Sequence, residues 1–151
     1  MNAAIVRPDD WNLPLLLHVG SAMVFVGVLA AVAVILAASR GSGDVPAALR
    51  LAFRTLLLGG IPSYIVMRGA AEWIASEEDV DEDAAWIGIG YIVTDAGLLI
   101  LIALTVLAGL ASRRAARGGE PRGLVRPATA LAVLLIAAYA VALWAMTAKP
   151  V

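Results

Sequence analysis

Four long apolar stretches constrain this chain more than any other feature. Trp11–Ser39 and Pro127–Ala148 contain no Asp, Glu, Lys or Arg, whereas Leu51–Ile74 contains three such residues and Ala84–Ser112 contains one. Each stretch exceeds the roughly 20 residues that a helix needs to cross about 30 Å of hydrocarbon. Because 62% of the 151 residues are hydrophobic, the chain does not fit a water-soluble domain. The sequence therefore predicts an all-α polytopic membrane protein, a four-transmembrane-helix bundle with up-down-up-down order.

We expect a single transmembrane domain over residues 1–151, with helices at approximately 12–38, 51–75, 85–112 and 127–148. The first stretch does not fit a removable signal peptide, because its apolar run is much longer than the usual ~7–15 residues. No cluster of Lys or Arg comes directly before it. The chain contains no cysteine, so disulfides and cysteine metal ligands are excluded.

The charges of the connecting segments predict the orientation. The first, "SRGSGDVPAALRLAFR", carries three arginines, the third, "SRRAARGGEPRGLVR", carries five, and the second, "SEEDVDEDAA", carries no basic residue. Cytoplasmic loops collect Lys and Arg, so loops 39–50 and 113–126 are expected in the cytoplasm and both termini outside. The outer helix ends would then carry an interfacial aromatic belt made of Trp11, Trp73, Trp86 and Trp144. The excess of Arg over Lys suggests a high-GC bacterial genome, and hence the inner (plasma) membrane.

Polar side chains interrupt three of the apolar stretches at a similar depth. At 1.5 Å per residue, Arg68 lies roughly 9 Å below the outer edge, His18 about 10 Å and Asp95 about 13 Å. Charged groups at the centre of a spanning helix cost about 2.5–3.5 kcal/mol, so these residues are expected to gather, with Arg68 pairing with Asp95. Further polar side chains lie one helical turn away on the same faces. The predicted polar site, in the outer half of the membrane, consists of His18, Tyr64, Arg68, Glu72, Tyr91 and Asp95.

The same residues also have a purely structural interpretation. Arg68 could extend to the interface and pair there with a solvated Glu72, which would contribute little. A lone histidine such as His18 more often packs than binds a ligand. Together with methionines of the outer half it could ligate haem or copper, but no HxxxH spacing supports this. No cofactor is therefore predicted, and the sequence leaves open whether a metal binds.

Catalytic and nucleotide-binding motifs are missing from the sequence. Asp79, Asp81 and Asp83 imitate the start of a calcium loop, but Ala84 stands where that loop needs glycine. There is no GxxxxGK[ST], HExxH or GxSxG motif. His18 has Ser21 nearby but no third member of a catalytic group. The sequence therefore favours a non-enzymatic protein, and loops this short do not predict nucleic-acid binding.

Glycines and one proline predict how the helices pack and bend. Pro62 follows Gly59 and Gly60 and cannot donate to the Leu58 carbonyl, so the second helix should weaken or bend near mid-membrane. Such a bend below polar groups is typical of transporters but also suits a structural bundle. Other glycines should allow close helix approach, namely Gly20, Gly27, Gly88, Gly90 and Gly97.

The segments "LHVGSAMVFVG", "MRGAAEWI" and "WIGIGYIVTDAG" resemble those of uncharacterised bacterial families of small four-helix integral membrane proteins with an early "LH" in helix one. The resemblance implies the fold and the membrane localisation only, and His18 matches the early histidine.

Two functional hypotheses follow for a chain in the lipid bilayer. One is a non-enzymatic binding or transport protein with an outward-facing polar site, in which case a transporter would be a homodimer. The other is a structural or accessory subunit of a larger membrane complex. A cavity lined by His18, Arg68 and Asp95 would favour the first hypothesis, and a dry, fully paired cluster would favour the second.

Overall fold

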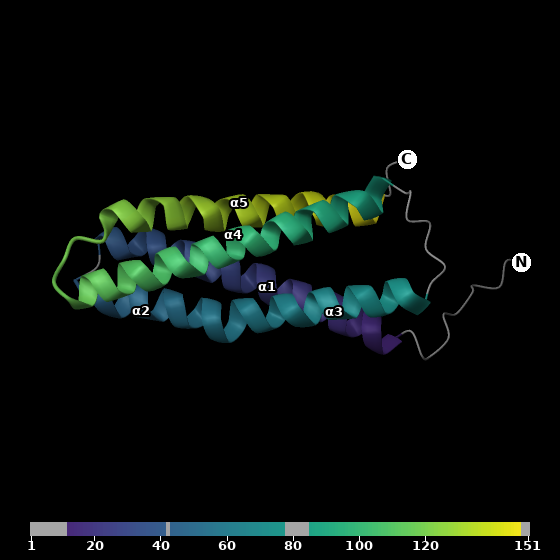
Figure 1. The fold of residues 1–151 in the computed structure, drawn as a ribbon, viewed down its shortest axis with the longest axis horizontal. Helices are drawn as coiled ribbons and strands as arrows, with labels where there is room; N and C mark the ends of the chain where they lie inside the picture. Colours follow the sequence, from purple (N-terminus) through teal and green to yellow (C-terminus); the bar gives the residue numbers. More distant parts are fainter. Residues whose placement is uncertain (1–11, 42, 78–84, 149–151) are drawn as a thin grey trace, which may run out of the picture.

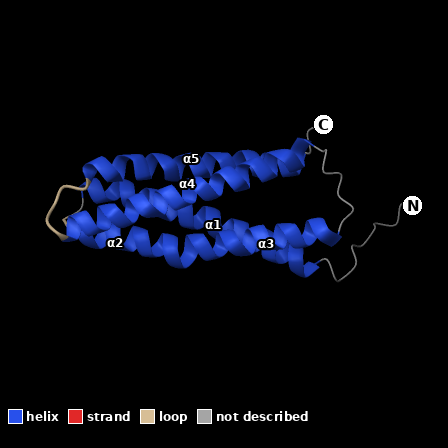
Figure 2. Ribbon diagram, in the orientation of Figure 1, coloured by secondary structure: helices blue, strands red, loops and turns tan. Residues whose placement is uncertain are grey.

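The computed structural model describes residues 12–41, 43–77 and 85–148, and within these ranges the chain is helical and contains no strand (Figures 1 and 2). The long helices α1 (Asn12–Ala38), α4 (Ala85–Ala116) and α5 (Arg122–Ala148) are continuous. The second stretch consists of α2 (Val45–Thr55), the π-helical segment η3 (Leu56–Gly60) and α3 (Ile61–Glu77). A 3-10 turn, η2 (Ser39–Gly41), follows α1. In the part of the chain that the structure describes, four helices are thus long and apolar enough to cross a membrane.

The helices lie side by side along one long axis (Figure 1). Helix α1 packs along α3 and α5, whereas α4 packs along α5 and, further on, along α2. The connections after α1 and after α4 lie at one end of the bundle, and the beginnings of α1 and α4 lie at the other (Figure 1). Helices α3 and α5 end at this second end, which therefore corresponds to the predicted outer side.

The core is formed by stripes of residues spaced three or four apart, which share one face of a helix. In α1 the fully buried residues are Phe25, Leu29, Val32 and Leu36. In α4 and α5 small residues dominate the stripes and allow the two helices to approach closely: Ala108, Ala111, Ala115, Ala128, Ala132, Ala142 and Ala145.

The outer surface of the bundle is strongly apolar. Large side chains more than two-thirds exposed occur on α1 and α4, for example Leu16, Met23, Ile92 and Leu99. On α3 and α5, Ile65 and Leu143 are 61% and 66% exposed. A soluble monomer rarely shows so much continuous apolar surface. This surface suits lipid, which agrees with the length of the helices.

Two helices begin earlier than the hydrophobic pattern predicts. Helix α2 begins at Val45, because the Asp44 carboxylate accepts a hydrogen bond from the Ala47 N–H at 3.0 Å and so caps the first turn. Helix α5 begins at Arg122 and contains Pro127 in its second turn. The predicted helices at 51–75 and 127–148 were too short, since arginine-bearing ends extend past the apolar stretch.

The predicted cytoplasmic loops 39–50 and 113–126 are correspondingly shorter. Helix α4 continues to Ala116, and Gly118, with φ of 73°, reverses the chain just after it. The Gly119 N–H donates to the Arg114 carbonyl at 3.0 Å, which satisfies one of the last carbonyls of α4.

The interruption predicted at Gly59, Gly60 and Pro62 takes the form of the π segment η3. The Ile61 N–H donates to the Leu56 carbonyl, five residues earlier, so the hydrogen-bond ladder continues despite the proline. The Ser63 hydroxyl donates to the Gly59 carbonyl at 2.6 Å. Figure 1 shows the helix bowing where α2 passes into α3. The π segment and the serine hydroxyl thus supply hydrogen bonds to backbone carbonyls on either side of the one that Pro62 leaves without its usual donor.

Candidate functional site

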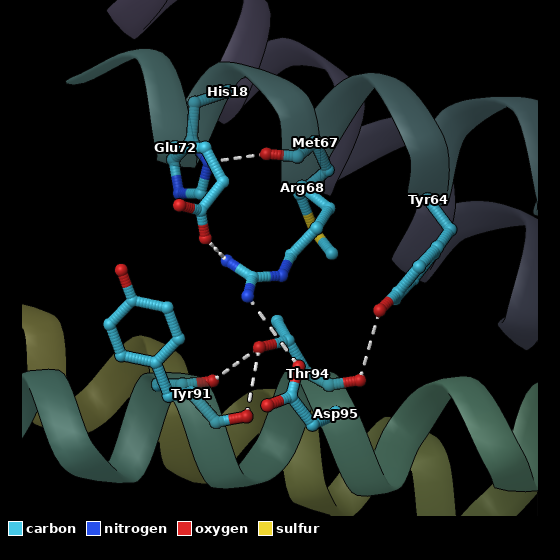
Figure 3. Close-up of polar contacts among 9 residues, drawn as sticks. His18, Tyr64, Met67, Arg68, Glu72, Tyr91, Thr94 and Asp95 are labelled. Atoms are coloured by element: carbon cyan, nitrogen blue, oxygen red, sulfur yellow. Dashed lines mark hydrogen bonds and ion pairs between the residues drawn. The ribbon is translucent and has the colours of Figure 1, made fainter. Parts of the chain in front are cut away.

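The Arg68 guanidinium is the centre of a charged network between α3 and α4 (Figure 3). Its Nη1 forms an ion pair with Glu72 Oε1 one turn along α3, and its Nη2 lies 3.6 Å from Asp95 Oδ1 of α4. The guanidinium carbon also lies 4.8 Å from the centre of the Tyr91 ring, within the range of a cation–π interaction. The predicted pairing of Arg68 with Asp95 is therefore confirmed. We call Arg68, Glu72, Tyr91 and Asp95 the Arg68 network.

Helical spacing explains why these four side chains meet. Arg68 and Glu72 are four residues apart and share one face of α3, and Tyr91 and Asp95 do the same on α4. Neither helix has the other as its main packing partner, because α3 packs on α1 and α4 packs on α5. The network therefore joins α3 to α4 through side chains.

Tyr64 forms a second bridge between the same helices. Its hydroxyl donates to the Thr94 carbonyl at 3.1 Å, one turn inward from Arg68 (Figure 3). The Thr94 hydroxyl in turn donates to the Gly90 carbonyl at 2.8 Å, which fixes its own orientation. Tyr64 was predicted as part of the site, whereas Thr94 was not, since it contributes a backbone carbonyl that any residue type would have.

The charges of the Arg68 network do not balance. Two carboxylates share one guanidinium, which leaves one net negative charge when both acids are ionised. The Arg68 side chain is 26% exposed, whereas those of Glu72 and Asp95 are 53% and 67% exposed. Ionisable groups in a membrane normally face the bundle interior or a water-filled space. Both acids are thus more exposed than the arginine that they share.

His18 takes part differently from the prediction. Its Nδ1 lies 3.0 Å from the Met67 carbonyl oxygen, and because a carbonyl can only accept, Nδ1 carries the proton and donates. The bond joins α1 to α3 and forms in both the neutral and the charged ring. It connects His18 to the backbone beside Arg68, and no ion pair joins the ring to Glu72 or Asp95 among the described residues.

An aromatic layer lies next to the network and includes a residue that the sequence did not single out. The Phe25 ring contacts the rings of Tyr64 and Tyr139 edge-on, with centroid distances of 5.8 and 5.0 Å. Tyr139 is buried, and its hydroxyl has no hydrogen-bond partner within the described part of the chain. Tyr139 lies five residues before Trp144, as Arg68 lies five before Trp73. Counting back five residues from each tryptophan would have placed Tyr139 at the same depth as Arg68.

The haem or copper alternative gains no ligand set from the structure. The described residues contain no group of three or more His, Cys, Asp or Glu side chains that could hold a metal ion. His18 is hydrogen-bonded to the Met67 backbone carbonyl. The calcium-loop-like segment with Asp79, Asp81 and Asp83 lies outside the described residues, as does Trp11.

Comparison with known proteins identifies no relative. No protein-family model, no curated protein and no solved structure matches the chain. The resemblance to small four-helix bacterial families therefore stays a prediction, and any argument about function depends on the geometry of the bundle.

Proposed function

We propose that the chain is a multi-pass protein of the bacterial inner membrane that binds a lipophilic cation at the Arg68 network and is not an enzyme. In this proposal the four helices run up-down-up-down, both termini face outward, and the network lies in the outer half of the membrane. The arginines at the opposite end of the bundle support this orientation.

One observation carries the proposal: the carboxylates of Glu72 and Asp95, both at least half exposed, share the single guanidinium of Arg68. An unneutralised carboxylate at membrane depth costs about 2.5–3.5 kcal/mol on insertion scales, less toward the interface. A bound cation would remove this cost by pairing with Asp95 and Glu72. The negative charge therefore selects a cation over an anion or a neutral solute.

The surroundings of Asp95 favour a cation with an apolar body. On α4, Ile92 precedes Asp95 by three residues and Leu99 follows by four, so the three side chains share one face. Ile92 and Leu99 are each 70% exposed. An apolar ligand could bury these side chains while its charge meets the carboxylate, and the Tyr91 ring offers a further contact for a cation.

The accessory-subunit alternative is based on the same exposed acids, Glu72 and Asp95. A helix of a larger partner would then supply Lys or Arg to Asp95 and cover the stripe of Ile92 and Leu99. A second copy of this chain placed on the same face would bring another excess negative charge. A homodimer through this face is therefore disfavoured, and the partner would be a different protein.

The test measures binding of tetraphenylphosphonium to the purified chain in an uncharged detergent by isothermal titration calorimetry. We expect saturable binding that weakens about tenfold in Asp95→Asn, equivalent to about 1.4 kcal/mol, and also weakens in Glu72→Gln. Tetraphenylborate has the same shape and the opposite charge, and it should not bind. Glu120→Gln, which removes an acid at the other end of the bundle, serves as the matched control.

Three outcomes would overturn the proposal. Equal uptake of the cation and the anion would show partition into the micelle. Saturable binding that survives both Asp95→Asn and Glu72→Gln would place the cation elsewhere. No binding by a folded wild-type chain would favour the accessory-subunit alternative.

A further inference from the structure

A second polar feature lies at the opposite end of the bundle. An open groove there is lined by Arg40 of η2 and by Arg126 and Thr129 of α5. The Arg40 Nη2 donates to the Thr129 hydroxyl at 3.4 Å, while that hydroxyl donates to the Val125 carbonyl at 2.8 Å. Thr129 is thereby fixed as an acceptor and holds the Arg40 side chain against α5.

The rest of the groove is apolar and follows α5 toward the middle of the bundle. Its remaining wall includes Val133, Leu134 and Ala137, and the first two are 54% and 51% exposed. From Arg126 to Ala137 the helix rises about 16 Å, at 1.5 Å per residue. Half of a hydrocarbon core of about 30 Å is about 15 Å. The groove thus extends over the depth of one leaflet, with its cationic end at the headgroup level.

We propose that this groove binds one anionic phospholipid, with the phosphate between Arg40 and Arg126 and an acyl chain along Val133, Leu134 and Ala137. The proposal depends on the membrane insertion proposed above but not on the Arg68 network. Guanidinium groups bind phosphate oxygens through two parallel N–H donors, which suits them to this headgroup. An acyl chain in a leaflet runs roughly parallel to a spanning helix, as the groove does.

The charges of the groove support an anionic occupant over a zwitterionic one. Within the described residues, neither Arg40 nor Arg126 has an acidic side chain at ion-pair distance, whereas Arg122 has Glu120 at 3.5 Å. Both groove arginines are exposed. Two unneutralised guanidinium groups beside an apolar wall would attract a lipid with net negative charge. The quaternary amine of a choline headgroup would weaken that attraction.

The test is native mass spectrometry of the full chain in an uncharged detergent with defined lipids. We expect one dioleoylphosphatidylglycerol to be retained per chain, and dioleoylphosphatidylcholine to be retained at least about fivefold less. The double variant Arg40→Gln/Arg126→Gln should lose that preference. The variant Arg113→Gln/Arg117→Gln removes the same charge from the same end of the bundle but outside the groove, and should keep it.

A third variant tests the apolar part of the site. Ala137→Trp places a bulky ring in the groove and should reduce phosphatidylglycerol retention while leaving both arginines in place. Inorganic phosphate at the same concentration should not displace the lipid. Tetraphenylphosphonium binding should be unchanged in the arginine variants, so this proposal and the proposed function can fail separately.

Several results would overturn the phospholipid proposal. Equal losses in the two double variants would mean a diffuse attraction between the lipid and the basic end of the bundle. Equal retention of both lipids would show that charge does not select the occupant. Displacement by phosphate alone, or full retention in Ala137→Trp, would show that no acyl chain occupies the groove.

Discussion

The Arg68 Nη2 on α3 lies 3.6 Å from the Asp95 carboxylate on α4, and this ion pair crosses between two helices that pack mainly on other partners. The hydrogen bond from Tyr64 to the Thr94 carbonyl crosses the same boundary one turn further inward. Polar side chains therefore link α3 to α4 at this end. A ligand that pairs with Asp95 or Glu72 would compete with Arg68 and so weaken this connection between α3 and α4.

Removing members of the Arg68 network should give non-additive losses of stability. Arg68→Ala should be the most damaging single change, because it leaves both Glu72 and Asp95 without their cation. Asp95→Ala should cost less, since Arg68 keeps Glu72. In the double variant the two losses should overlap by about 0.5–1 kcal/mol, as for residues in direct contact. Unfolding of the four proteins in detergent measures this coupling.

A control cycle on an exposed pair calibrates that result. Arg122 Nε lies 3.5 Å from Glu120 Oε1 at the beginning of α5, and both side chains are more than 70% exposed. Solvent screens such pairs, so their coupling should be close to zero. Strictly additive losses for Arg68 and Asp95 would contradict a direct interaction between them.

The sequence predicted those parts of the fold that depend on the period and length of its apolar stretches. The existence of four helices and the pairing of Arg68 with Asp95 followed from helix length and from depth counted along the axis. The beginnings of α2 and α5 did not, because the helices continue through arginine-bearing turns that hydropathy assigns to loops. Asp44 could have indicated the first of these beginnings, since an Asp before Val-Pro is a helix-capping pattern.

Side-chain direction explains the other differences between prediction and structure. Counting depth placed His18 near the Arg68 network but could not show that its ring points to the Met67 carbonyl. The same limit applies to the glycines. Gly90 and Gly97 do face α5, whereas Gly20, Gly27 and Gly88 have no neighbouring atom within 4 Å of an added Cβ. Which face of a helix meets a neighbour depends on tertiary packing, and periodicity was too weak in these uniformly apolar helices to reveal it.

Glycine-to-alanine changes should therefore have opposite effects at two positions. In Gly109→Ala the new Cβ would lie 2.9 Å from the Phe53 ring, so either this ring or the two helices must shift. Overpacking of this kind costs about 1–3 kcal/mol. Gly27→Ala meets nothing within 4 Å and should gain up to about 1 kcal/mol of helix propensity. Melting temperatures in detergent should fall for the first variant and rise for the second. The opposite order would contradict the packing of Phe53 on Gly109.

The proposed orientation can be tested with reporter fusions in bacteria. A protein that fluoresces only in the cytoplasm should stay dark when fused after Val151, because the C-terminus is expected outside. The same reporter inserted at Gly118, in the turn after α4, should be bright. An alkaline phosphatase fusion, active only outside, should give the reverse pattern. Bright cells from the C-terminal fusion would invert the orientation and place the Arg68 network in the inner half.

Two tyrosines of the aromatic layer offer a matched comparison, since both rings contact Phe25 but only one hydroxyl has a partner. Tyr64→Phe removes the hydrogen bond to the Thr94 carbonyl and should cost about 0.5–1.5 kcal/mol. The Tyr139 hydroxyl is buried without a partner among the described residues, so Tyr139→Phe should remove a desolvation penalty and stabilise the protein by about 1 kcal/mol. Both changes keep the ring, so the contacts with Phe25 persist and the difference isolates the hydroxyl. Unfolding of the two variants in the same detergent measures the contrast. If Tyr139→Phe is as destabilising as Tyr64→Phe, the Tyr139 hydroxyl has a polar partner, and an internal water between α4 and α5 would be the first to seek.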